Sequence, residues 1–190
     1  LARNSAPRNV AGDIGRLFGE AIAKKQDQDL IALFDGFSTA VGDGTTAINT
    51  ASIFNALSTL RGNALNINEC AVVLHPKIAY DLKANLTNTF ANANANDLSN
   101  EALRSGFVGT LAGMRIFETS NMSNTGTTGD YKGGAFHRDA IALAEMQGLK
   151  IETQRDASLR ADEIVATAVY GVGEIHDTYG VELHHDSSIQ

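Results

Sequence analysis

The sequence of 190 residues contains one cysteine, two prolines and no tryptophan. A single cysteine, Cys70, excludes an internal disulfide and fits a reducing compartment. No apolar run approaches the roughly 20 residues that a membrane-spanning helix needs. The first residues also lack the charged and then apolar pattern of a secretory signal. The chain starts with Leu rather than Met, which indicates a processed or partial polypeptide.

Positive charge is scarce, because 15 Lys and Arg residues stand against 22 Asp and Glu residues and give a net charge of -7. This balance argues against a surface that binds nucleic acid through its phosphates. It is compatible with a protein that encloses nucleic acid without adhering to it. A hydrophobic content of 43% is typical of a globular protein, and the length suffices for one domain or two small ones.

The segment 10–37 is the strongest feature that is present, because its apolar residues recur at helical spacing. They form one stripe: Val10, Ile14, Leu17, Phe18, Ala21, Ile22, Leu30, Leu33, Phe34 and Phe37. Residues 24–29 interrupt the stripe with polar side chains, but no proline or glycine lies between Ala21 and Phe34. The pattern therefore predicts one helix of about 40 Å rather than two. Three glycines share one face and favour the close approach of another backbone: Gly12, Gly15 and Gly19.

The segment 38–148 has the mixed pattern of a small α/β unit. Its expected elements are a loop over 38–49, a helix over 50–62, a strand over 69–74, a helix from Pro76, a hairpin over 107–119 and a strand over 135–144. Asn49 or Thr50 would cap the first of these helices. Two stretches, 87–100 and 120–133, have little to bury and are expected to be loops that are mobile or ordered by a partner.

The tail predicts three strands in succession, which are 149–156, 163–171 and 174–183. Apolar residues alternate with period two in the second of them, as in a sheet with one covered face. Short turns suit an antiparallel meander. The fold class is therefore α+β, with one domain formed by 1–37 and 149–190 and another by 38–148.

The sharpest chemical motif is Gly-Asp-Gly-Thr-Thr at 42–46, directly before a capped helix. It resembles the phosphate-binding loop of chaperonin ATPases, in which Asp43 could hold Mg²⁺. Five residues of common loop types also match by chance, and the rest of a chaperonin is absent, so a plain turn is the favoured interpretation.

Other polar residues do not assemble into a site. Cys70 and His75 would lie about 16 Å apart in a strand, which favours a buried thiol and a histidine at a helix start. Because His184 and His185 are adjacent, they would point to opposite faces, so a zinc site with His176 and Asp186 is not expected. We predict no catalytic residue, no metal ligand and no cofactor.

One stretch alternates in charge and is a candidate subunit interface: Arg155, Asp156, Arg160, Asp162 and Glu163.

Several phrases, in this order, resemble the major capsid protein of tailed bacteriophages, the HK97-like fold. Those phrases are 72–82 (VVLHPKIAYDL), 108–119 (VGTLAGMRIFET), 135–144 (AFHRDAIALA), 151–156 (IETQRD) and 170–172 (YGV). The resemblance implies that 10–37 is the spine helix, that the tail closes a peripheral domain and that the middle is the axial domain. The family places an N-terminal arm and a long hairpin, the E-loop, before the spine helix, and nine residues cannot hold them.

The resemblance also implies a function. It predicts a structural, non-enzymatic subunit that self-assembles as hexamers and pentamers into an icosahedral head around double-stranded DNA. Portal, scaffolding and decoration proteins are possible partners, and no membrane is involved. Assembly would take place in the host bacterial cytoplasm and the product would be the virion. The alternatives are an encapsulin-like nanocompartment shell and, from another class, a Mg-nucleotide-binding domain that uses the loop at 42–46.

Overall fold

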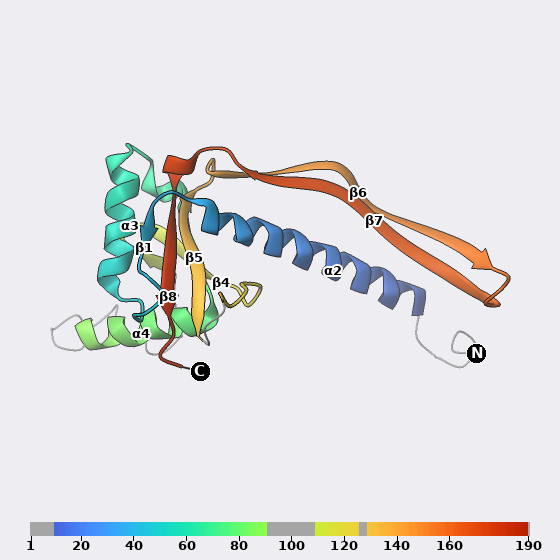
Figure 1. The fold of residues 1–190 in the computed structure, drawn as a ribbon, viewed down its shortest axis with the longest axis horizontal. Coiled ribbons are helices and arrows are strands. Elements are labelled where there is room, and N and C mark those ends of the chain that lie inside the picture. The colour runs from blue at the N-terminus through green and yellow to red at the C-terminus, as the bar shows by residue number, and fades with distance from the viewer. Residues whose placement is uncertain (1–9, 91–108, 126–128, 190) are drawn as a thin grey trace. The chain divides into compact units, whose positions relative to one another are not determined.

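The computed structural model describes residues 10–90, 109–125 and 129–189 (Figure 1). The chain divides into two compact units. The first comprises Leu1–Asp29 and Leu143–Val172, and the second comprises Leu30–Ala142 and Gly173–Gln190. Helix α2 and strands β6 and β7 run from one unit into the other. The elements confirm the predicted α+β class.

Helix α2, Val10–Ala32, confirms the single long helix. At 1.5 Å per residue its 23 residues span about 35 Å. The polar stretch within it is helical and carries an i,i+4 ion pair of 2.5 Å between Lys25 and Asp29. The predicted end at Phe37 is wrong, because the chain tightens into a 3-10 turn, η1 (Leu33–Gly36). This turn directs Phe34 and Phe37 into the core of the second unit.

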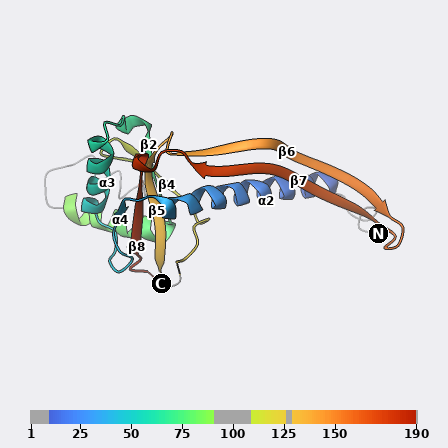
Figure 2. The ribbon, with the colours of Figure 1, turned by 45° about the horizontal axis from the view of Figure 1, so that its top comes forward.

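The first unit pairs this helix with a long hairpin, β6 (Ile141–Asp156) and β7 (Ala161–Glu174), which form a two-stranded sheet (Figure 2). Alternating residues of β7 are half-buried, which confirms the predicted period: Ile164, Ala166, Ala168 and Tyr170. Tyr170 donates a hydrogen bond of 2.7 Å from its hydroxyl to Asp29 Oδ2. The half-buried face of β7 is therefore the face toward α2.

The second unit is built on a mixed sheet in the order β1-β8-β5-β2-β4-β3. Its strands are β1 (Ala40–Val41), β2 (Cys70–Leu74), β3 (Thr110–Leu111), β4 (Met114–Glu118), β5 (Asp130–His137) and β8 (Gly180–Asp186). Pairs β1–β8 and β2–β4 are parallel, and the other pairs are antiparallel. The three-stranded meander predicted for the tail is therefore wrong, because β8 leaves the hairpin and pairs with β5 and β1.

Two boundaries predicted for the middle segment are also wrong. Residues 130–133 belong to β5 rather than to a loop, and a turn at 138–140 separates β5 from β6 where one strand over 135–144 was expected. The close packing of Phe34 on Gly134 shows why a glycine-rich stretch can form a central strand. A Cβ atom there would lie 2.8 Å from the Phe34 ring, so only glycine lets η1 pack on β5. Of the two predicted loops, 87–100 and 120–133, the parts at 91–100 and 126–128 lie outside the described residues, and 87–90 are helical.

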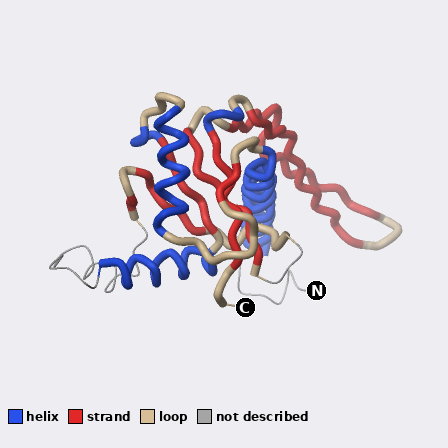
Figure 3. The backbone as a smooth tube through the Cα atoms, turned by 60° about the vertical axis from the view of Figure 1, so that its left-hand side comes forward, coloured by secondary structure: helices blue, strands red, loops and turns tan. Residues whose placement is uncertain are grey.

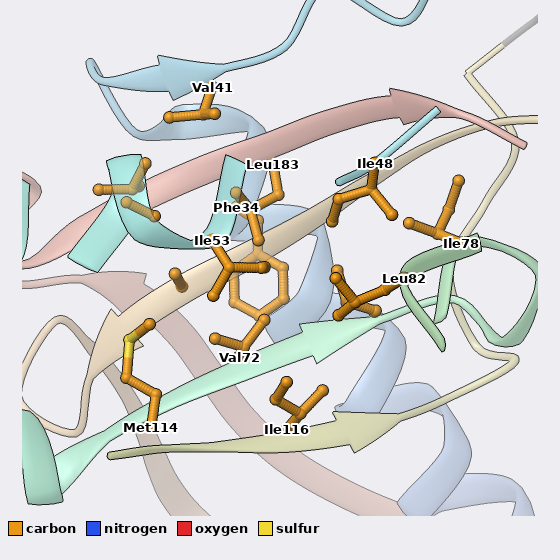
Figure 4. Packing of buried hydrophobic residues seen from close by; sticks show 14 of the residues in the cluster. Phe34, Val41, Ile48, Ile53, Val72, Ile78, Leu82, Met114, Ile116 and Leu183 are labelled. Atoms are coloured by element: carbon orange, nitrogen blue, oxygen red, sulfur yellow. The ribbon is translucent and has the colours of Figure 1, made fainter. Parts of the chain in front are cut away.

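Helices α3 (Thr50–Gly62) and α4 (Pro76–Phe90) cover one face of this sheet (Figure 3). The predicted cap is confirmed, since the Asn49 side chain accepts a hydrogen bond of 2.9 Å from Ser52 N. Pro76 starts α4 as expected. Between the helices and the sheet lies an apolar core (Figure 4), whose fully buried members include Ile48, Ile53, Leu60, Val72, Leu74, Leu82, Met114 and Leu183. Phe54, which also lies on α3, is exposed.

The predicted hairpin over 107–119 is confirmed in its described part. Strands β3 and β4 are joined by Ala112 and Gly113, which both have positive φ, of 54° and 90°. A two-residue hairpin turn of type I′ requires a positive φ at both of its central residues. Short 3-10 turns, η2 (Ile67–Glu69) and η3 (Asp177–Tyr179), complete the unit.

Candidate subunit interface

The residues predicted as an interface lie together at the tip of the β6–β7 hairpin. Arg155 Nη1 lies 3.7 Å from Asp162 Oδ1, and Gln154 Nε2 donates to Glu163 Oε2 at 3.0 Å. Both are cross-strand pairs, and all four side chains are exposed. Exposed pairs of this kind contribute about 0–1 kcal/mol each to stability, so these two pairs add little to the stability of the fold.

Asp156 accepts the hydrogen bonds that form the turn at the hairpin tip. Its Oδ1 accepts hydrogen bonds from Ser158 N at 2.8 Å, from Ser158 Oγ at 2.6 Å and from Leu159 N at 3.3 Å. The hydrogen bond from the Ser158 hydroxyl, followed by those from the two amides, lowers the pKa of Asp156. Arg160 closes the turn with a φ of 51°, which is uncommon for a residue other than glycine. The tip therefore presents its charges in one defined shape.

Leu159 is a residue of this tip that sequence reasoning missed. It lies between the charged residues and is 75% exposed. The sequence signal for Leu159 is an apolar residue among charged residues in a predicted turn. Such a turn lies in solvent, so its own chain offers nothing to cover an apolar side chain. The described residues leave it in water.

An apolar strip follows the same hairpin. Because side chains alternate along a strand, Leu149 and Ile151 lie on the same face of the hairpin as Arg155, and Ala166 and Ala168 lie on the same face as its partner Asp162. Ala166 and Ala168 are half-buried on the face toward α2. On this face Tyr170 of β7 contacts Asp29 of α2, whereas Leu149 and Ile151 of β6 are exposed. Met146, on the other face of β6, is 89% exposed.

Helix α2 adds a smooth and open surface. Among the described residues, no atom lies within 4 Å of the Cβ position of Gly15 or Gly19. The close backbone approach expected at Gly15 is therefore not made within the described part of the chain. Leu17 is exposed on the same helix. The hydrogen bond from Tyr170 to Asp29 joins β7 to the helix. The hydrogen bond from Lys25, within the helix, is the largest cause of a lowered Asp29 pKa.

The loop Gly42–Thr46 is a turn, as favoured from the sequence. Asp43 Oδ1 accepts hydrogen bonds from Thr45 N at 3.1 Å and Thr45 Oγ1 at 2.7 Å. Gly44 N donates to His184 O at 3.1 Å. Groups that would have to bind phosphate are thus engaged within the protein.

The remaining candidates also have structural roles. The Cys70 thiol is buried, which raises its pKa. The His75 ring stacks on Tyr131 at a centroid distance of 3.7 Å, and burial lowers the His75 pKa. No group of three or more potential ligands that could hold a metal ion occurs among the residues the structure describes. No helix in the described ranges is long and apolar enough to cross a membrane.

The architecture, a long helix with a two-stranded hairpin and a mixed sheet with two helices, matches solved shell proteins. The chain is 28% identical to a protein of Mycobacterium phage Che8, with a TM-score of 0.72 over 90% of this chain and 61% of that one. It is similar to the capsid of the cyanophage P-SCSP1u, with 18% identity and a TM-score of 0.70 over 98% and 69%. An encapsulin complex from Synechococcus elongatus gives 15% identity and 0.66 over 98% and 69%. The fold is therefore HK97-like, as the resemblance implied.

The sequence matches the phage capsid protein family over residues 1–181, and the chain belongs to this family. Its members are structural proteins rather than enzymes. No curated protein matches the chain. The chain spans 61% of the length of the Che8 protein.

Proposed function

We propose that this chain is the shell-forming part of a major capsid protein, many copies of which form the icosahedral head of a tailed phage around double-stranded DNA. The observation that carries the proposal is the open face of the β6–β7 hairpin. Leu149 and Ile151 are exposed on the face of the hairpin on which Tyr170 contacts α2. A two-stranded sheet is marginal by itself in water. A neighbouring copy that covered this face would stabilise it.

The interface would comprise the open strip and the hairpin tip with Arg155, Asp156, Arg160, Asp162 and Glu163. In this proposal the unit with α2 and the hairpin has the peripheral role and the six-stranded unit has the axial role. The domain division predicted from the sequence, 1–37 with 149–190 against 38–148, remains a prediction about these roles. Hexamers and pentamers, with portal, scaffolding and decoration proteins, would complete the head in the host bacterial cytoplasm.

The acidic balance of the chain fits an enclosing role. A net charge of -7 would repel packaged DNA rather than hold it, because like charges raise the free energy of adhesion. The shell would then confine DNA by its shape alone.

Electron microscopy of particles formed by the whole protein tests the proposal. Icosahedral particles are expected, and those from infected cells should contain double-stranded DNA. Particles that instead carry an enzyme cargo and no genome would favour the encapsulin-like alternative. A whole protein that stays monomeric under all assembly conditions would contradict both.

The nucleotide-binding alternative has a separate test. Titration with Mg-ATP should give no binding heat, because Asp43 Oδ1 and the Gly44 amide are engaged within the protein. A saturable signal that Asp43→Ala abolishes would revive this alternative.

A further inference from the structure

The loop Gly42–Thr46 completes the outer edge of β8. On one side of it, β1 pairs with β8 in parallel at Glu182 and Leu183. Across the loop, Gly44 N donates to His184 O at 3.1 Å, and Asp186 N donates to Thr46 O at 3.1 Å. The loop thus satisfies backbone groups of β8 beyond the point where the two-residue strand β1 ends.

Two glycines let the loop lie directly on two histidines. Gly42 has a φ of 92°, and a Cβ atom there would lie 2.2 Å from His184 O and 2.7 Å from His185 Cε1. Gly44 has a φ of 72°, and a Cβ atom there would lie 2.6 Å from His184 Nε2. Both the backbone conformation and the space require glycine. The loop is therefore fitted to this pair of imidazoles.

His185 is the buried member of the pair, with 2% of its surface exposed. Its Nδ1 lies 3.2 Å from Thr46 O. A carbonyl oxygen only accepts, so Nδ1 must carry the proton of the neutral ring and Nε2 the lone pair. Nε2 is buried and has no hydrogen-bond partner among the described residues. A second proton, on Nε2, would therefore place a charge where no described residue accepts a hydrogen bond from it.

The surroundings of His185 decide how it titrates. From the loop, Asp43 favours the charged form, and the neighbouring His184 disfavours it. From β5, Asp130 Oδ1 lies 2.7 Å from His184 Nε2, and Lys132 is the register partner of His184. Tyr131 is the register partner of His185, and its ring stacks on His75. Asp186, the last residue of β8, accepts a hydrogen bond from Ser187 N, and Asp81 on α4 accepts one from Ser188 N.

We propose that the loop Gly42–Thr46 is a pH-sensitive clip on the edge of the six-stranded sheet. Neutral His185 holds Thr46 O through its Nδ1–H, and the glycines seat the loop on both rings. Acidification places a proton from solvent on His185 Nε2. The loop lies against the Nδ1 and Cε1 atoms of the ring, and in this proposal it is the part that lifts away from β8 to give the charged ring water, so that protonation and opening are coupled.

The direction of the effect follows from burial. Burial lowers the pKa of His185 in the closed clip below its ordinary value. The open state therefore binds the proton more tightly, and the closed clip loses stability as the pH falls below about 6.5 toward the pKa of the closed state. Above that window His185 is neutral in both states and the clip stays closed.

Nitrogen NMR of the assembled whole protein, with ¹⁵N-labelled histidine, tests the first step. At pH 7.5 His185 should be the Nδ1–H tautomer, and its pKa should lie below the ordinary histidine value of about 6.5. An Nε2–H tautomer, or titration of His185 at or above that ordinary value, would overturn the proposal.

Hydrogen exchange of the whole protein tests the coupling. After correction for intrinsic exchange rates, the amides of 42–46 and 184–186 should exchange faster as the pH falls. The acceleration should reach up to about tenfold per pH unit between the pKa of His185 in the open clip and its lower pKa in the closed clip. His185→Asn keeps a donor near Thr46 O but cannot titrate, so this acceleration should disappear. His176→Asn is the matched control and should behave like the wild type. Equal acceleration in His185→Asn and the wild type would overturn the proposed clip. If His185→Asn does not fold, the NMR measurement of the tautomer and pKa of His185 in the wild type decides whether the proposal holds.

Discussion

At the residue scale, glycines set how closely the elements of the second unit pack. Gly180, at the start of β8, faces the ring of Phe37, and a Cβ atom there would lie 2.2 Å from it. Gly134 makes the equivalent contact with Phe34. The segment after the long helix can lie on the sheet only because these two strand positions have no side chain.

We therefore expect Gly180→Ala to lower the free energy of unfolding by about 1–3 kcal/mol, because a buried aromatic ring would have to move. Gly171→Ala is the matched control. It also lies in a strand, and no described atom lies within 4 Å of its Cβ position, so its effect should stay within about 0.5 kcal/mol. Urea denaturation followed by circular dichroism measures both. Equal stabilities of the two variants would contradict the close packing of Phe37 on β8.

At the element scale, the spine helix and the hairpin have open surfaces, whereas the edges of the six-stranded sheet are guarded. Strands β1 and β3 at those edges have two residues each, which limits edge-to-edge association. The hairpin strands are far longer and lack this protection. Contacts with another copy are therefore expected at the first unit rather than at the sheet edges.

Gly15→Ala separates the properties of the single chain from those of the assembly. Its Cβ meets no described atom, so the substitution should raise the stability of the unassembled chain by up to about 1 kcal/mol through helix propensity. If a neighbouring copy packs on this face, the same variant should assemble less well. Thermal unfolding and sedimentation measure the two effects. A less stable unassembled chain would contradict the open face.

The double reversal Arg155→Glu and Arg160→Glu should leave the chain folded and block or misdirect assembly. The reason is that exposed pairs contribute register and partner choice more than stability. Circular dichroism reports the fold, and electron microscopy reports the particles. Arg61→Glu with Arg115→Glu makes the same change in net charge at two exposed positions of the second unit and serves as control. Normal particles from the tip variant would remove these residues from the interface.

At the scale of the whole molecule, the charge balance separates enclosing from binding. With a net charge of -7, the whole chain should show no measurable affinity for duplex DNA at about 0.15 M salt. Fluorescence anisotropy with a short labelled duplex measures this, and a basic protein of similar size serves as the positive control. Tight binding that weakens steeply with added salt would show a basic surface that the net charge conceals.

Local patterns in the amino-acid sequence determined several elements by themselves. A stretch free of proline and glycine was enough to predict that α2 continues through its polar residues. The helix cap at Asn49 and the helix start at Pro76 were also predictable, because an Asn side chain can accept a hydrogen bond from the first turn and Pro lacks an N–H that the first turn does not need. These elements depend on residues only a few positions apart, which is why the sequence alone determined them.

Only the tertiary structure decided where the last strand goes. The strand predicted at 174–183 was expected to extend the hairpin, but the last strand covers 180–186 and pairs with β5 and β1, where Phe37 and the loop at 42–46 pack on it from distant parts of the chain. The open strip at Leu149 and Ile151 was equally invisible in the sequence, since apolar alternation predicts a covered face but not what covers it. Strand partners and covered faces depend on contacts between residues far apart in the chain, and such contacts leave no periodic signal in the sequence.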